Sequence, residues 1–476
     1  MDPGLKILSS AENKHCDILT IRMEGMNAHD LMDRATLRIF HYIQDIFPTD
    51  KPITFFCGPG NNGADGLCIA SLFAAKGYPV ETKVCLLGKA PSSALQFRLK
   101  LYSARQKLNI QVIQDLKDLT ILDDTPFVDA LFGTGLTQPL QGEWEKLVYF
   151  INQQKRMVVS IDMPSGLTDE PGKTKIPFVN AQKVIAIQCP KPSLLYAENQ
   201  LDFETVDCGI NTESIDTKRY FLDAHHLNVQ QQMKQLLPLR PRHSHKGSYG
   251  HTLLIGGNNG MHGAISMAAK ACYEAGSGLT TVLSPETAIP YLSAHPEIMH
   301  ITQALDAVAI EKLPKNKFRS VAIGPGLGVT SDATALFTAA LKHFPFPLIL
   351  DADALNIMAQ HPALMKTLPA GTLITPHPGE FARLFGSTEN GRQKEILALE
   401  HSHTLGIYIL AKNTYSFLAC PDGKIFYNGT GNSSMARGGS GDKLTGMIAG
   451  LYAQHQNMRD AALAGMYFSG IGKPII

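Results

Sequence analysis

A glycine-rich segment near residue 440 carries the residue pattern with the clearest chemical meaning. In Gly438-Gly439-Ser440-Gly441-Asp442, glycines and a serine precede an aspartate and then a helix-like run of small apolar residues. Glycines let successive backbone N–H groups face one point at a helix N-terminus, where they bind an anion such as a phosphoryl group. Asp442 could then accept the proton of an attacking hydroxyl, and we expect the helix dipole to keep it ionised. A helix-capping aspartate would leave the glycine run unexplained, so we predict a nucleotide-dependent enzyme with Asp442 as its reactive carboxylate.

A second glycine loop lies in the first half of the chain. Residues 58–63, Gly-Pro-Gly-Asn-Asn-Gly, follow a strand-like run and open a helix, which formally satisfies a dinucleotide-binding pattern. A dehydrogenase would also place an acidic residue at the end of the next strand, whereas here residues 88–89 are Gly-Lys. The polar side chains of Asn61, Asn62 and Asp65 instead suit a loop that holds a phosphate, a ring amide or a cation.

Two more strand ends in this half carry aspartates followed by glycine turns. They are residues 129–135 and 160–166. Because the carboxyl ends of parallel strands share one edge, oxygens of Asn62, Asp129 and Ser165 could together bind a hard cation. The alternative is that Asp129 and Asp162 only cap turns, as aspartate often does before glycine. Spacing alone leaves both interpretations open.

The elements that must position these residues follow one pattern in both halves. Short apolar or β-branched runs alternate with longer helical stretches, which predicts an α/β fold of two three-layer α/β/α domains with mostly parallel sheets. An amphipathic helix is expected at residues 28–42, ahead of the first strand. The strand-like runs are 53–57, 80–87, 127–131, 158–161, 184–187, 252–255, 279–283, 321–323, 348–350, 373–375 and 408–411.

Length and composition narrow the class of protein. At 476 residues two domains are expected, and we place their boundary near residue 215, giving residues 1–215 and 216–476. The 43 basic and 42 acidic residues give no electrostatic footprint for nucleic acid or an anionic membrane, so small-molecule substrates are expected. Eight scattered cysteines without a CxxC pair, and the lack of a signal or membrane segment, indicate a cytoplasmic protein. The sequence leaves the oligomeric state open, a homo-oligomer included.

The first half resembles the NAD(P)H-hydrate epimerases, a Rossmann-like family that interconverts the R and S forms of cofactors hydrated at C6 of the nicotinamide ring. The resemblance rests on four segments: residues 31–35, Leu-Met-Asp-Arg-Ala; 61–66, Asn-Asn-Gly-Ala-Asp-Gly; 129–135, Asp-Ala-Leu-Phe-Gly-Thr-Gly; and 162–167, Asp-Met-Pro-Ser-Gly-Leu.

That resemblance implies a potassium ion at Asn62, Asp129 and Ser165, with Asp162 moving protons at the hydrated ring. It also implies substrate contacts by Asn61, Asn62, Gly63, Ala64, Asp65, Gly133, Thr134, Gly135, Leu136, Thr137, Gln138, Pro139 and Asp162. Ala64 departs from the family, which usually has glycine there. If the position requires a positive φ, the alanine costs about 1 kcal/mol and loosens the site.

The second half resembles the ADP-dependent NAD(P)H-hydrate dehydratases, which are ribokinase-like. The matching segments are residues 245–247, 256–257, 295–299, 351–356, 375–380 and 438–446. The implied cofactors are ADP as phosphoryl donor, with Mg²⁺, and the implied reaction is phosphorylation of the C6 hydroxyl followed by elimination of phosphate. By the same resemblance the S hydrate contacts Ala264, Gly326, His377 and Asp442, and the nucleotide contacts Lys412, Asn413, Thr414, Tyr415, Ser416 and Gly441.

Three departures from the dehydratase pattern bear on activity. Residues 412–416 are bulkier than the usual loop, Arg437 is expected near the phosphates, and the chain stops at residue 476 where relatives continue with another helical segment. The glycine loop at Asp442 would equally serve a small-molecule kinase of the thiazole or pyrimidine type. An epimerase fused to an inactive second domain is the other alternative.

Overall fold

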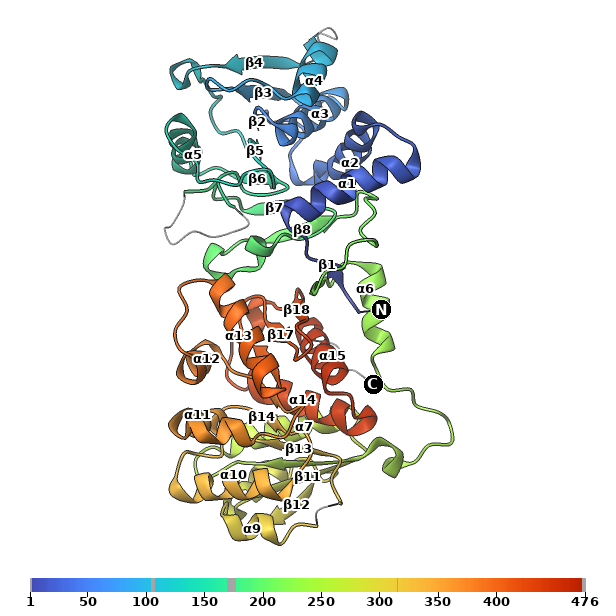
Figure 1. The fold of residues 1–476 in the computed structure, drawn as a ribbon, viewed down its shortest axis with the longest axis vertical. Coiled ribbons are helices and arrows are strands. Elements are labelled where there is room, and N and C mark those ends of the chain that lie inside the picture. Colours follow the sequence, from blue (N-terminus) through green and yellow to red (C-terminus); the bar gives the residue numbers. More distant parts are fainter. Residues whose placement is uncertain (1, 104–107, 169–176, 315, 473–476) are drawn as a thin grey trace. The chain divides into compact units, whose positions relative to one another are not determined.

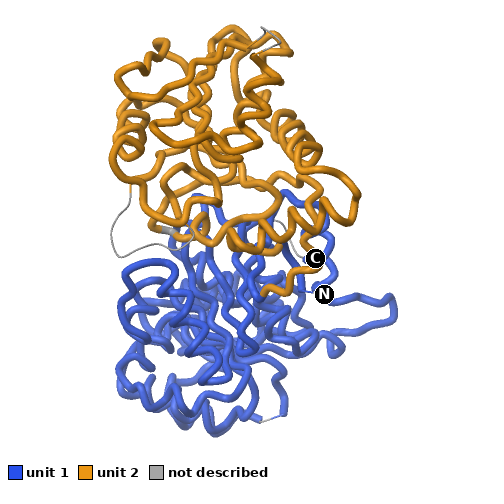
Figure 2. Tube along the Cα trace, turned by 45° about the horizontal axis from the view of Figure 1, so that its top comes forward, with its two compact units in different colours: residues 1–5, 218–476 blue, residues 6–217 orange. Residues whose placement is uncertain are grey.

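The computed structural model describes residues 2–103, 108–168, 177–314 and 316–472 (Figure 1). The chain forms two compact units, one of residues 6–217 and one of residues 1–5 together with 218–476 (Figure 2). The sequence patterns did not indicate that the first five residues pack with the C-terminal unit. The early chain end noted at residues 473–476 lies outside the described residues.

The N-terminal unit is built on a seven-stranded, fully parallel sheet. Its strand order is β4-β3-β2-β5-β6-β7-β8, so the chain changes its direction of progress across the sheet between β2 and β5. In such sheets the ligand crevice lies at this switch point, outside the carboxyl ends of the strands. The strands are β2 (Ile53–Cys57), β3 (Val80–Cys85), β4 (Asn109–Ile113), β5 (Phe127–Ala130), β6 (Val158–Ile161), β7 (Lys183–Ile187) and β8 (Phe203–Val206).

Helices cover both faces of this sheet. Side chains of α2 (Ala28–Ile43), α3 (Asn61–Ala75) and α4 (Ser93–Ser103) share one buried core with the strands, and α5 (Glu143–Gln153) belongs to the core on the opposite face. α2 is the predicted amphipathic helix. α1 (Ser10–Glu24) was not predicted, because only Cys16 and Thr20 of its fifteen residues are buried and it has no continuous apolar stripe.

The C-terminal unit contains an eleven-stranded mixed sheet. Strands β10 to β16 are parallel, and their order places the switch point between β10 and β13. The central strands match the predicted runs to within one or two residues, whereas the flanking strands β9, β12, β17 and β18 were not predicted. The strands are β9 (Arg219–Leu222), β10 (His251–Ile255), β11 (Leu279–Ser284), β12 (Met299–Thr302), β13 (Ser320–Ile323), β14 (Ile349–Leu350), β15 (Leu373–Ile374), β16 (Tyr408–Ala411), β17 (Phe417–Ala419) and β18 (Ile425–Asn428), with β1 (Leu5–Lys6) beside β9.

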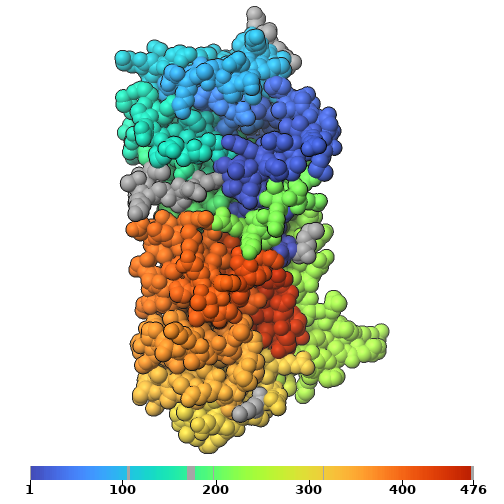
Figure 3. Space-filling model, viewed as in Figure 1, coloured from blue at the N-terminus to red at the C-terminus, as the bar shows by residue number. Residues whose placement is uncertain are grey.

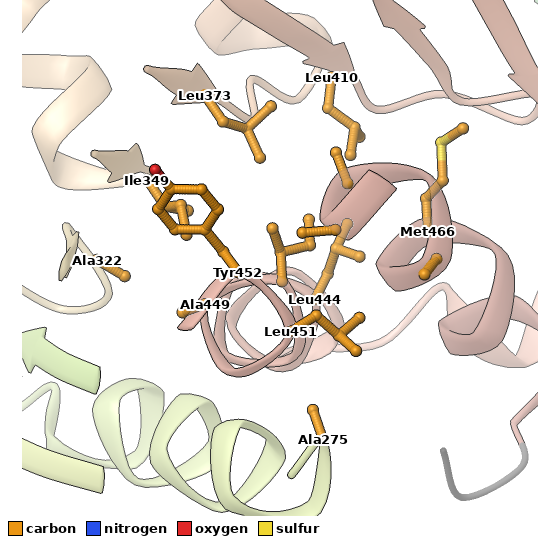
Figure 4. Packing of buried hydrophobic residues seen from close by; sticks show 14 of the residues in the cluster. Ala275, Ala322, Ile349, Leu373, Leu410, Leu444, Ala449, Leu451, Tyr452 and Met466 are labelled. Carbon is orange, nitrogen blue, oxygen red and sulfur yellow. The ribbon is translucent and has the colours of Figure 1, made fainter. Parts of the chain in front are cut away.

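Helix α14 (Ser440–His455) lies at the centre of a buried core of this unit. Figure 4 shows its Leu444, Ala449 and Tyr452 among strand residues such as Ile349 and Leu373. The same core includes α6 (Leu227–Gln235), α7 (His262–Glu274) and α15 (Met458–Ile471). The other face of the sheet carries α9 (Ala307–Glu311), α10 (Ser331–His343), α11 (Asp353–Gln360), α12 (Pro378–Phe385) and α13 (Gly391–Leu405) (Figure 1).

The first residues of the chain are fixed by contacts within the C-terminal unit. Asp2 forms ion pairs with Lys424 at 3.0 Å and with Arg459 at 3.1 Å. The Gly4 N–H donates to Gln232 Oε1 of α6. These contacts make the N-terminal segment part of this unit.

The segment after α6 projects from the C-terminal unit (Figure 3), and Leu239 within it is 89% exposed.

All eight cysteines are buried and free. In the described ranges, every helix is too short or too polar to cross a membrane.

Candidate active sites

The loops that follow β2, β5 and β6 meet at the switch point of the N-terminal sheet. Helix α3 begins at Asn61 and starts so close to the preceding loop that a Cβ on Gly63 would lie 1.8 Å from the Gly58 carbonyl oxygen. Gly133 is equally confined, since a Cβ there would lie 2.6 Å from Asp162 Oδ2 and 3.2 Å from Asn62. Backbone segments from two loops therefore approach the Asp162 carboxylate closely.

Ala64 is not strained in this arrangement. It lies inside α3, is fully buried, and is absent from the described residues other than glycine that have positive φ. Its N–H donates to the Gly60 carbonyl. The condition under which alanine would loosen the site, a positive φ, is therefore not met, because the backbone there is ordinary helix.

Asp162 is held by one donor on each carboxylate oxygen. Oδ2 accepts the Thr134 N–H at 2.9 Å, and Oδ1 is 2.5 Å from the Lys191 ammonium. Lys191 is only 1% exposed, and its ammonium also donates to the Ile187 carbonyl. Asp162 itself has a φ of 69°, a conformation that non-glycine residues adopt at a cost and that often marks functional sites. Lys191 stands in no motif that marks it as a site residue.

The three residues expected to bind a cation are all buried, and hydrogen bonds join Asp129 to Ser165. Asp129 Oδ1 accepts the Ser165 hydroxyl at 2.6 Å, and Oδ2 accepts the Ser165 N–H and the Ser160 hydroxyl. Burial raises the pKa of Asp129, and the hydrogen bonds from Ser165 counteract that rise. Asn62 is tied to Ile161 through its amide nitrogen, while its Oδ1 is buried without a hydrogen-bond partner.

The remaining predicted contact residues are spread from buried to exposed. Gly63 and Ala64 are buried in α3, Thr134 is half-buried, and Asn61 is exposed at the helix start. Burial, followed by repulsion from Asp162 and Asp17, raises the pKa of Asp65. In the loop after β5, Leu136 is half-buried, whereas Gly135, Thr137, Gln138 and Pro139 are exposed.

In the C-terminal unit the loops after β10 and β13 meet at the second switch point. The N–H groups of Gly257 and Asn258 donate to the carbonyls of Pro325 and Gly326. A Cβ on Gly326 would lie 3.4 Å from the Ala264 Cβ. The structure thus brings together Ala264 and Gly326, two residues predicted to contact one substrate.

Asp442 lies in the first turn of α14, directly after the glycine run. Gly439 precedes the helix with a φ of 86°, a left-handed conformation that glycine tolerates best. Burial, and then repulsion from Asp351, raises the pKa of Asp442. The expected stabilisation of its ionised form by the helix dipole is therefore outweighed. A raised pKa brings a carboxylate closer to the range in which a general base works best at neutral pH.

An ion pair links the loop after β16 to α14. The Lys412 ammonium is 2.6 Å from Asp351 Oδ1, and Asp351 Oδ2 accepts the Thr445 hydroxyl of α14. Burial alone would raise the pKa of Asp351, but the Lys412 charge and the hydrogen bonds from Lys412 and Thr445 lower it below its usual range. A Cβ on Gly441 would lie 3.1 Å from Lys412 Nζ, so the ammonium faces the N-terminus of α14. Asp351 was not among the predicted site residues.

The next residues of that loop form a tight turn that bonds mainly to itself. Asn413 N–H donates to the Ser416 hydroxyl, and Thr414 N–H donates to Asn413 Oδ1. The Tyr415 ring packs against Phe221 in an edge-on contact. Arg437 is exposed just before the glycine run.

His377 and Glu380 form a reciprocal cap at the start of α12. Glu380 Oε2 accepts the His377 N–H at 2.8 Å, and His377 Nδ1 accepts the Gly379 N–H. The second ring nitrogen of His377 is 3.4 Å from Glu380 Oε1. Burial raises the pKa of Glu380 to about 7, while burial and the charge of Lys412 lower that of His377. Glu380 is a titratable group near the site that motif matching did not select.

Similar proteins cover almost the whole chain. The family described as NAD(P)H-hydrate dehydratase matches residues 252–472, and the family described as YjeF-related protein N-terminus matches residues 28–193. The bifunctional NAD(P)H-hydrate repair enzyme Nnr of Moorella thermoacetica is 33% identical, over 98% of this chain and 91% of the relative. The enzyme of the same name from Escherichia coli is 31% identical, over 98% and 87%.

Among solved structures, a similar one is the ADP/ATP-dependent NAD(P)H-hydrate dehydratase from Bacillus subtilis, co-crystallized with ATP/Mg²⁺. It is 32% identical and covers 51% of this chain and 86% of its own, with a TM-score of 0.45.

Proposed function

Because this chain belongs to the family of bifunctional NAD(P)H-hydrate repair enzymes, we propose that its two sites divide one repair task. The protein epimerises R- and S-NAD(P)HX and dehydrates the S form to NAD(P)H with ADP, releasing AMP and phosphate. We assign epimerisation to the unit of residues 6–217 and dehydration to the unit of residues 1–5 and 218–476, in place of a simple division of the chain at residue 215. Spontaneous hydration gives both epimers, so an S-specific dehydratase alone would leave half of the damage unrepaired.

In the dehydratase site we assign Asp442 as the base that takes the proton of the C6 hydroxyl. The observation that carries this proposal is the placement of Asp442 beside Gly441, whose backbone the Lys412 ammonium faces. A carboxylate and a cation at one helix N-terminus are what phosphoryl transfer to a hydroxyl requires. Residues 412–416 and Gly441 hold the nucleotide, and Ala264, Gly326 and His377 hold the S hydrate. Mg²⁺ carried with ADP would neutralise charge on its phosphates.

In the epimerase site we assign Asp162 as the group that takes a proton from the hydrated ring, which lies against residues 61–65 and 133–139. Potassium is assigned to Asn62, Asp129 and Ser165. Its support is the buried, unpartnered Asn62 Oδ1 and the all-oxygen character of the donors, which suits a hard cation. A bound cation would offset the negative charge of the buried Asp129. The eight buried thiols fit a reducing compartment, and we propose the cytoplasm.

The dehydratase assignment is tested with purified full-length protein, S-NADHX and ADP, by following the absorbance of the reduced nicotinamide. The absorbance should recover only when the nucleotide is present. Asp442→Asn should lower kcat by roughly 10²–10⁴-fold, because an amide cannot accept the hydroxyl proton. Asp332→Asn, which neutralises an exposed carboxylate on α10, serves as the matched control. If Asp442→Asn restores the absorbance at the full rate, Asp442 is not the base. If the unmodified protein restores none with either ADP or ATP, the proposed dehydratase activity is refuted.

A further inference from the structure

Asp17 lies on the face of α1 that contacts the epimerase site. The Ser10 hydroxyl of α1 donates to the Thr134 carbonyl, and Thr134 is the residue whose N–H holds Asp162. Asp17 follows Ser10 by seven residues, or two helical turns, so the two side chains lie on the same face of the helix. That face is therefore the one directed at the Asp162 loop.

The other partner of Asp162 is also adjacent to this helix. Leu8 N–H, just before α1, donates to the carbonyl of Pro190, the residue preceding Lys191. Cys16 packs with Leu8 and Cys189 in a small buried cluster. α1 is thus anchored on both sides of Asp162, at Thr134 and beside Lys191.

Asp17 and Asp162 both interact with the buried Lys191 ammonium. Lys191 bonds to Asp162 at 2.5 Å, whereas Asp17 has no ion pair or hydrogen bond among the residues that the structure describes. The charged groups that face Asp17 are Asp162, Lys191 and, from α3, Asp65. Burial, and then repulsion from Asp162, raise the pKa of Asp17 to about 6, against the opposing effect of Lys191.

We propose that Asp17 is a second catalytic residue of the epimerase site, the proton donor that works opposite the Asp162 carboxylate. The proposal rests on the proposed epimerase function. Two carboxyls whose surroundings separate their protonation states are a recurrent way of providing one base and one acid in a single site. Asp162, paired with the Lys191 ammonium, takes a proton from the substrate, and Asp17 gives one.

The step that this pair supports is opening and closing of the hydrated ring. The hydroxyl-bearing C6 is bonded to the ring nitrogen N1. Asp162 takes the hydroxyl proton, the O–H electron pair forms a C6–O double bond, and the C6–N1 bond breaks with its electrons on N1, which receives the proton of Asp17. Rotation about the C5–C6 bond presents the other face of the new carbonyl. Reclosure returns each proton to its donor and leaves C6 inverted, with no net redox change.

The test follows interconversion of R- and S-NADHX by the full chain without nucleotide, so that dehydration does not occur, with the epimers separated chromatographically. Asp17→Asn should lower kcat by roughly 10²–10⁴-fold with little change in KM, because asparagine cannot supply the proton. In the unmodified chain, kcat/KM should fall above about pH 6 as Asp17 loses its proton, and the residual activity of Asp17→Asn should lack that decline. Asp17→Glu, which restores an acid, should recover part of the rate.

Asp50→Asn provides the matched control, since Asp50 is an exposed carboxylate in the segment that enters β2 at the opposite end of the strand. In ¹⁸O-labelled water the epimerised product should retain its original C6 oxygen. One labelled oxygen per turnover would overturn ring opening. If the unmodified chain does not interconvert the epimers, the proposed function itself fails. If it does and Asp17→Asn matches its rate, only the assignment of Asp17 fails.

Discussion

The Lys412 ammonium lies 2.6 Å from Asp351 Oδ1, while the other oxygen of Asp351 accepts a hydrogen bond from Thr445 in α14. One buried carboxylate thus joins the loop after β16 to the helix that begins at the glycine run. This link fixes the Lys412 ammonium at Gly441, where we place the phosphates of the nucleotide.

Lys412→Met should impair both ADP use and stability. Removing the ammonium leaves Asp351 buried and unpaired, which costs about 3 kcal/mol in the free energy of unfolding, and we expect KM for ADP to rise at least tenfold, as about 1.4 kcal/mol of lost binding would produce. Urea unfolding and initial rates measure the two effects. Adding Asp351→Asn to Lys412→Met should restore stability but not KM. Lys443→Met serves as the control, since Lys443 is an exposed lysine in the first turn of α14, beside Gly441. It should change neither the stability nor KM for ADP. An effect equal to that of Lys412→Met would contradict the role of Lys412 in binding the nucleotide.

Lys191→Met should destabilise the N-terminal unit by about 3–5 kcal/mol, because the buried Asp162 carboxylate would lose its cationic partner. Epimerisation should be lost along with that stability. The comparison is Lys183→Met, which breaks the pair between Lys183 and Glu204 on the partly exposed side of the sheet. Surface pairs contribute about 0–1 kcal/mol, so the control should unfold almost as the parent does. Similar losses in both variants would show that Lys191 has no special role.

Glu380 should make the stability of the C-terminal unit depend on pH. Its pKa is raised to about 7 in the folded protein, above its ordinary value, so the folded state binds a proton that the unfolded state has released. The free energy of unfolding should therefore decrease as pH rises towards 7, by an amount on the order of 3 kcal/mol. Glu380→Gln cannot titrate and should gain stability relative to the parent between pH 5 and pH 8, measured by urea unfolding. Glu400→Gln, an exposed glutamate on α13, should show no such gain, and a parallel response would refute the prediction.

Gly63→Ala and Ala64→Gly should behave in opposite ways despite being neighbours. A methyl group on Gly63 would lie 1.8 Å from the Gly58 carbonyl oxygen, so we expect a loss of about 3 kcal/mol or more. Ala64 is in ordinary helix, and glycine there should cost only about 1 kcal/mol and should not improve epimerisation. Thermal unfolding and epimerisation rates of the two variants check this. Faster epimerisation by Ala64→Gly would mean that alanine does constrain the site.

The central strands were predictable because they are buried on both faces and read as short apolar runs, such as residues 53–57 and 321–323. Once the strands are known, the polar residues that follow them are predictable too, because the carboxyl ends of parallel strands lie at one edge of the sheet. The Asp129 loop was selected in this way, whereas Asp442 was selected from the glycine run that precedes it. Strands β17 and β18 lie inside the sheet but are only three and four residues long, and they pair with each other in antiparallel fashion, so the alternation of strand and helix does not indicate them.

Other site residues could not be read from the sequence because burial and pairing define their roles. Lys191 lies 29 residues after Asp162 in a Pro-Lys-Pro segment that has no distinctive pattern. Asp17 is on a helix with no clear apolar stripe. The raised pKa of Asp442 comes from burial and then from repulsion by Asp351, which is 91 residues away and is brought close only by the fold.

The N-terminal segment has a consequence for the order of assembly during synthesis. Residues 1–5 are translated before the N-terminal unit, whereas their partners Lys424 and Arg459 are translated near the end of the chain. Asp2 therefore lacks its ion-pair partners until more than four hundred further residues have been translated. Since domains generally fold as units while the chain grows, residues 6–217 can fold first and the ion pairs of Asp2 can close only at the end. The C-terminal unit is thus completed by a segment that is translated before the N-terminal unit.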